Sequence, residues 1–97
     1  MKKIKVDSYD IELAINGMYQ MRNTYPTEKK NQVNDIILSL LDLCDKMKPG
    51  RKKRIRIEST SLSMIYQCLI DWRNDKLQRG ETTAVEIINE ELLLFAK

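Results

Sequence analysis

Two short segments of the chain alternate apolar and polar residues. They are KIKVD, residues 3–7, and KRIRIE, residues 53–58. In both, β-branched Ile or Val occupies every second position and charged residues stand between them, as in a strand with one face buried. The alternation predicts two β-strands, each with one apolar face and one charged face.

Four longer segments carry apolar residues at helical spacing instead. The four stripes are Ile11, Ala14, Ile15, Met18 and Met21; Val33, Ile36, Ile37, Leu40, Cys44 and Met47; Leu62, Ile65, Tyr66, Leu69 and Trp72; and Val85, Ile88, Leu92 and Phe95. The spacing predicts amphipathic helices, and the order along the chain is strand, helix, helix, twice.

Residues that commonly stand at helix ends lie between these segments. The hydroxyls of Ser8 and Ser59 are expected to cap the helices that follow the strands. Thr83 and Glu86 have the spacing of a capping box for the last helix. Other helix boundaries are marked by Pro26, Pro49, Gly50 and Gly80.

The two halves of the chain resemble each other. KKIKVDS begins at Lys2 and KRIRIES at Lys53, a separation of 51 residues, and the same shift aligns Arg22-Asn23 with Arg73-Asn74. Chance similarity between amphipathic helices is the alternative explanation, because apolar periodicity alone produces some matches. The matching strands and Arg-Asn pairs favour an internal duplication, with repeat 1 at 1–48, a linker at 49–52 and repeat 2 at 53–97.

A lone five-residue strand is not stable in water, because its backbone groups need partners. The simplest solution pairs the two strands antiparallel about a pseudo-two-fold axis and presses Ile4, Val6, Ile55 and Ile57 onto the helices. The predicted fold is therefore mainly α with a two-stranded antiparallel ribbon, internally duplicated as β-α-α/β-α-α.

The composition is that of one domain with a core of its own. The chain has 97 residues, of which 42% are apolar. Cys44 and Cys68 lie in apolar periodic segments and are expected to be free, buried thiols. Neither a signal-peptide pattern nor a membrane-spanning apolar run is visible, so we expect a cytoplasmic protein that does not engage a membrane.

Two strand-helix-helix units sharing a ribbon resemble the ribbon-helix-helix proteins of bacteria and phages, here fused in tandem. The segment GETTAVEII, residues 80–88, looks like the turn between that family's helices. The first half has YPTEKKNQVNDII instead, without glycine, and the first helix of each half is longer than in the family. The segment VDSYDIELAINGMYQMRN, residues 6–23, is also similar to small uncharacterised proteins of phages and mobile elements of Gram-positive bacteria.

The ribbon-helix-helix resemblance implies a DNA-binding surface on the charged face of the ribbon, which would enter the major groove. Basic residues gather on this face and at the strand ends: Lys3, Lys5, Arg51, Lys52, Lys53, Arg54 and Arg56. The expected partner is double-stranded DNA, and the expected role is that of a regulatory or accessory factor of a phage or mobile element. Alternatively, these charges only prevent edge-to-edge aggregation.

A protein-binding module is the second functional hypothesis, for example a phage or mobile-element inhibitor of a host defence enzyme. It draws on an acidic face predicted for the last helix, made of Glu81, Glu86, Glu90 and Glu91. Under either hypothesis, we expect a monomer or a weak homo-oligomer.

Enzymatic chemistry is not expected. The chain has no histidine and no Gly-rich phosphate loop, and neither cysteine has a partner at ligand spacing. Asp42 and Asp45 share one helical turn, which indicates a solvated face more strongly than a metal site. Trp72 is assigned to the core rather than to base stacking, because it is in register with Met21. We expect no cofactor and no small-molecule substrate.

Overall fold

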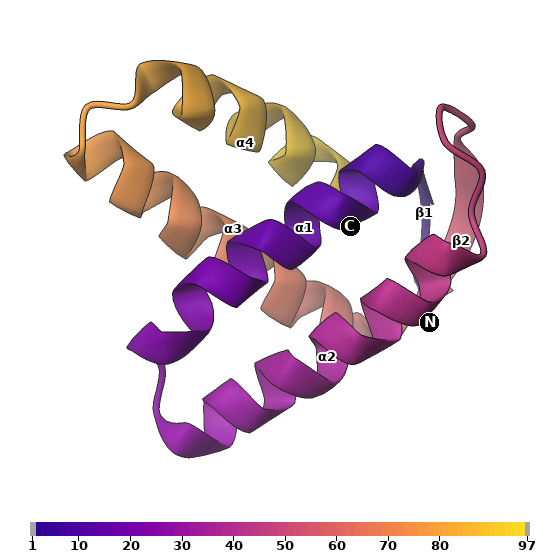
Figure 1. Ribbon diagram of the computed structural model, residues 1–97, viewed down its shortest axis with the longest axis horizontal. Helices are drawn as coiled ribbons and strands as arrows, with labels where there is room; N and C mark the ends of the chain where they lie inside the picture. The colour runs from indigo at the N-terminus through magenta and orange to yellow at the C-terminus, as the bar shows by residue number, and fades with distance from the viewer. Residues whose placement is uncertain (1, 97) are drawn as a thin grey trace.

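A computed structural model describes residues 2–96 and has the predicted order of elements (Figure 1). The elements are β1 (Lys2–Val6), α1 (Ser8–Met21), a 3-10 turn η1 (Arg22–Thr24), α2 (Thr27–Asp45), β2 (Lys53–Ile57), α3 (Ser59–Gln78) and α4 (Thr82–Phe95). The fold class, mainly helical with a two-stranded antiparallel sheet, is confirmed.

The two strands pair with each other, as predicted. Their antiparallel register sets Ile4 opposite Ile55 and Val6 opposite Lys53, and the strand bounds differ from the predicted ones by one residue. Ile4, Val6, Ile55 and Ile57 are all buried. The alternation therefore gives the ribbon one face that belongs to the core and one that faces solvent.

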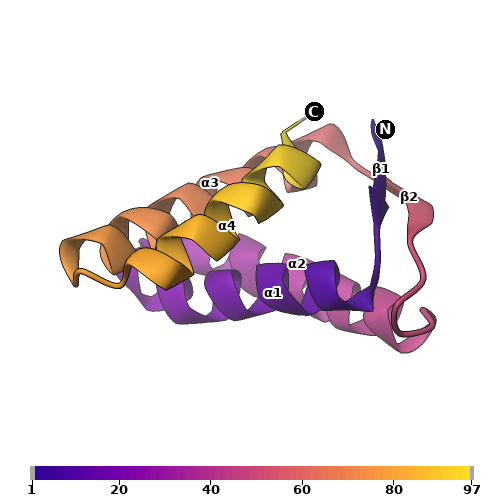
Figure 2. The ribbon, with the colours of Figure 1, turned by 90° about the horizontal axis from the view of Figure 1, so that it is seen from above.

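The helices form two hairpins, α1 with α2 and α3 with α4, and α1 packs across α3 (Figure 1). Strand β1 packs against α1 and α4, which places the ribbon at one end of the helices (Figure 2). Buried apolar side chains from all these elements form one core. The fully buried ones include Ile11, Met18, Val33, Ile65, Leu69, Ile88 and Phe95.

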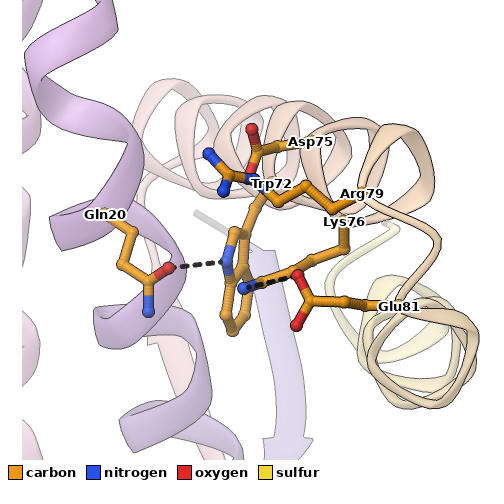
Figure 3. A network of polar contacts seen from close by, with 6 residues as sticks. All are labelled: Gln20, Trp72, Asp75, Lys76, Arg79 and Glu81. Atoms are coloured by element: carbon orange, nitrogen blue, oxygen red, sulfur yellow. Dashed lines mark hydrogen bonds and ion pairs between the residues drawn. The ribbon is translucent and has the colours of Figure 1, made fainter.

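Gly17 and Trp72 set the close approach of α1 and α3. A Cβ atom on Gly17 would lie 2.6 Å from Cε3 of Trp72, so a larger residue would force the helices apart. The indole N–H of Trp72 donates to Oε1 of Gln20 at 3.1 Å (Figure 3). Trp72 is only 7% exposed, which confirms its prediction as a core residue.

Gly80 terminates α3, as predicted from the sequence. Gly80 has φ +74°, and the N–H of Glu81 donates back to the carbonyl of Lys76 at 3.0 Å, as in a Schellman motif. Ion pairs between Lys76 and Glu81 and between Arg79 and Asp75 surround this turn (Figure 3).

Three of the predicted caps are wrong. Asp7, not Ser8, caps α1, because its carboxylate accepts the N–H of Asp10, and Ser8 is already the first helical residue. Helix α3 likewise begins at Ser59 and has no side-chain cap.

Helix α4 begins at Thr82, with Glu81 in the cap position and no side-chain cap bond. The start lies two residues earlier than a capping box formed by Thr83 and Glu86 requires, so Thr83 is inside the helix.

Helix α2 ends earlier than its apolar stripe suggested. Its last residue is Asp45, well before Pro49 and Gly50, so Met47 lies beyond the helix. Met47 is nevertheless buried, because the chain turns there and the N–H of Met47 still donates to the carbonyl of Cys44. Pro49 and Gly50 form a separate turn.

The internal duplication stays a prediction. The strand register is symmetric on exchange of the halves, since the pairs Lys3–Arg56 and Lys5–Arg54 map onto each other by the shift of 51 residues. The helix lengths are not symmetric: α1 and α2 have 14 and 19 residues, whereas α3 and α4 have 20 and 14.

Candidate nucleic-acid interface

The outer face of the ribbon carries four exposed cations in two facing pairs. Lys3 lies directly opposite Arg56, and Lys5 lies opposite Arg54. Within residues 2–96 none of the four forms an ion pair with an acidic side chain. Like charges that face each other across two strands repel, so this face has a destabilising arrangement that an external anion would relieve.

A shallow hollow of about 260 Å³ lies on this face, lined by Lys3, Ile4, Lys5 and Arg54. The pleat of the ribbon explains the grouping. Because the apolar residues of both strands point into the core, the basic residues between them all point the same way. The structure therefore brings together on one surface the four ribbon cations that the sequence predicted.

The other three predicted residues, Arg51, Lys52 and Lys53, are exposed at the entrance to β2. Lys53 is the first residue of β2 and pairs with Val6. Lys52 differs from the rest, because its Nζ lies 2.9 Å from Oδ2 of Asp10. Its charge is partly neutralised by a residue of α1, which the sequence did not indicate.

Asp10 is the centre of a buried polar cluster behind the ribbon. It is 3% exposed, and it exchanges two hydrogen bonds of 2.9 Å with Asp7, each carboxylate accepting the other residue's N–H. This reciprocal pair is the capping box of α1. Burial alone would raise the pKa of Asp10, but hydrogen bonds from the Asp7 N–H, Lys52 and Glu91 outweigh it and lower the pKa.

Glu91 of α4 completes this cluster. Its predicted place on an exposed acidic face is wrong. Its side chain is buried, at 6% exposed, and its Oε2 accepts no hydrogen bond in residues 2–96. Burial, followed by the hydrogen bond to Asp10, raises the pKa of Glu91 to about 8. The Glu91 carboxyl is therefore mainly protonated at neutral pH, so it can act as the donor in its hydrogen bond to the Asp10 carboxylate.

The other chemical candidates from the sequence are two carboxylates, Asp42 and Asp45, and two thiols, Cys44 and Cys68. Asp42 is exposed and pairs with Lys46 at 3.2 Å, and Asp45 is also exposed. Among the described residues, no group of three or more His, Cys, Asp or Glu side chains could hold a metal ion. Cys44 is half-buried and Cys68 buried, both as free thiols, and burial raises the pKa of each.

No family model, curated protein or solved structure matches this chain. Within residues 2–96, none of the helices combines the length and the apolar character needed to cross a membrane.

Proposed function

We propose that this protein binds double-stranded DNA through the outer face of its ribbon. The observation that supports the proposal is that Lys3 faces Arg56 and Lys5 faces Arg54 across the ribbon, and that none of the four forms an ion pair within residues 2–96. DNA phosphates would supply the missing negative charge and release condensed counterions. A two-stranded ribbon also fits the width of the major groove.

The two strands would contribute differently to the complex. The outward residues of β1 are lysines, whereas those of β2, Arg54 and Arg56, are arginines. A guanidinium can bind the O6 and N7 atoms of guanine with two hydrogen bonds, so β2 is suited to base recognition. By the ribbon-helix-helix resemblance, the role would be that of a regulatory or accessory factor of a phage or mobile element.

A protein-binding module, such as an inhibitor of a host defence enzyme, is the alternative proposal. It has less support, because Glu91 is buried and only Glu81, Glu86 and Glu90 remain exposed on the acidic face. A purely protective role of the ribbon charges against aggregation is the other alternative.

The test changes Lys5→Glu and Arg56→Glu together. The two new carboxylates would lie opposite Arg54 and Lys3, so each like-charge pair becomes an opposite-charge pair. Such pairs stabilise a ribbon by about 0.2–1 kcal/mol each, and the fold should therefore be at least as stable as in the wild type. DNA binding should weaken strongly, and its log–log salt dependence should flatten by about 1.8, at roughly 0.9 per lost phosphate contact.

The matched control changes Lys29→Glu and Lys30→Glu, which alters the net charge equally. Both residues lie in the first turn of α2, at the end of that helix away from the ribbon (Figure 1). Fluorescence anisotropy with random duplex DNA at several salt concentrations should show near-wild-type binding by the control. Equal losses in both variants, or no salt-dependent binding by the wild type, would contradict the proposal. A pull-down with the wild type and the ribbon variant would then test a protein partner.

A further inference from the structure

The loop between α2 and β2 forms a second basic surface, which we call the loop hollow. It has a volume of about 340 Å³ and is lined by Lys46, Met47, Lys48, Arg51, Lys52 and Lys53. Met47 is the only lining residue without a positive charge, and no acidic residue is among them. Lys46 and Lys48 were not among the residues predicted from the sequence.

The backbone of this loop is held in place at three points. Met47 is buried in the core. Gly50 has φ +76° and the N–H of Arg51 donates to the carbonyl of Lys48, which closes a turn with Pro49 at its second position. Lys52 is tied to the buried Asp10 at 2.9 Å. A loop fixed in this way loses little conformational entropy when a ligand binds.

The turn also holds unneutralised charges close together. Lys46 pairs with Asp42 and Lys52 with Asp10, but Lys48, Arg51 and Lys53 have no ion pair in the described part of the chain. Lys48 and Arg51 are the first and last residues of the turn, so their Cα atoms lie within about 7 Å of each other. Three cations around an open hollow match an oxyanion with several acceptor oxygens, such as a phosphate group.

We propose that the loop hollow binds phosphate groups of the DNA backbone beside the segment that the ribbon occupies. This inference rests on the proposed function for the source of the phosphate. The loop and the ribbon lie at the same end of the molecule, and the loop leads directly into β2, whose first residue, Lys53, lines the loop hollow (Figure 2). The ribbon would then contact base edges, while the loop hollow fixes the position of the protein on the backbone.

The loop variant for the test carries Lys48→Gln and Arg51→Gln, which keeps Pro49 and Gly50 at the centre of the turn and the Lys52–Asp10 ion pair. Lys29→Gln with Lys30→Gln is the control of equal charge. In the wild type, inorganic pyrophosphate should shift the amide NMR signals of residues 46–53. The shifts should be lost in the loop variant and kept both in the control and in the Lys5→Glu, Arg56→Glu ribbon variant.

Binding measurements with duplex DNA distinguish the contribution of the loop hollow from that of the ribbon. The loop variant should bind DNA more weakly than the control, with a salt dependence flatter by about 1.8. If the wild type binds DNA through the ribbon but the loop variant keeps the wild-type slope, the inference fails while the proposed function stands. If pyrophosphate binds the loop but no duplex binds, the proposed function fails, and the hollow is a site for free phosphate rather than for DNA.

Discussion

The two strand-helix junctions lie 51 residues apart in the sequence and differ in how they are held. At the first, Asp7 and Asp10 exchange hydrogen bonds, and Asp10 also contacts Lys52 and Glu91. At the second, Glu58 is exposed and makes no cap bond, and Ser61 stands where the first half has Asp10. Similar apolar patterns thus give the same elements, while buried polar contacts fix only the junction that adjoins the basic loop.

In the helices that follow these junctions, it is the second half that has the more extensive buried contact. Trp72 of α3 is buried, whereas Met21, at the corresponding position of α1, is half-buried. Gly17 of α1 leaves the space that the Trp72 ring fills. The second half therefore supplies the large side chain of the helix crossing, and the first half supplies the buried polar cluster.

The largest expected effect concerns the helix crossing. Trp72→Ala should lower the free energy of unfolding by about 3–5 kcal/mol, because it empties a large aromatic site. Met21→Ala should lower it by no more than about 2 kcal/mol, since that side chain is only partly buried. Urea denaturation of both variants measures the difference. Equal losses would show that the two halves contribute alike to the crossing.

A smaller effect is expected at the junctions. Asp10→Ala removes half of the capping box and the partner of Lys52, and should cost on the order of 2 kcal/mol. Lys52 adds little to this figure, because its side chain is 45% exposed. Ser61→Ala, the equivalent change in the second half, should cost less than about 0.5 kcal/mol. If the two variants unfold at the same denaturant concentration, the polar cluster does not fix the first junction.

The third prediction concerns the pH dependence of stability, because the polar cluster at the first junction includes Glu91, whose pKa is shifted. The pKa of Glu91 is about 8 in the folded protein, above its ordinary value near 4.3. The folded state therefore holds this proton more tightly than the unfolded chain. The stabilisation is complete below the ordinary pKa and is lost as pH rises through about 8. The melting temperature of the wild type should fall between pH 5.5 and 8.5.

Glu91→Gln should remove most of this slope, because its amide can donate to Asp10 but does not titrate. Circular dichroism melts in matched buffers test this directly. The chain has no histidine, and the two thiols, whose ordinary pKa is about 8.5, and the terminal amine contribute equally to both proteins. If the melting temperature of Glu91→Gln depends on pH as steeply as that of the wild type, the group that titrates is not Glu91.

Local pattern was sufficient to predict the elements of this fold. The strands, their antiparallel pairing and the outward direction of Lys3, Lys5, Arg54 and Arg56 follow from a period of two, because alternate side chains on a strand point to opposite faces. Cap positions were missed because Asp7 and Ser8 are adjacent and both are good caps, so only backbone geometry distinguishes them.

The polar cluster could not be derived in the same way. Lys52 and Asp10 are 42 residues apart, and only the folded chain brings them together. Glu91 did leave a signal, since it falls three residues after Ile88 and one before Leu92, within the buried stripe of α4. Because glutamate is rarely buried without a partner, Glu91 was predicted to be exposed despite its position in the stripe.

The ribbon joins the beginning of the chain to its middle, with both helices of the first hairpin between its strands. Closing a loop of this length has an entropic cost that local helix contacts do not share. A chain in which the first helical hairpin has not formed therefore has no ribbon, and its facing cations are not yet assembled. The basic surface exists only after β1 and β2 have paired, so a ligand of that surface binds the folded chain in preference to the unfolded one and raises its thermal stability.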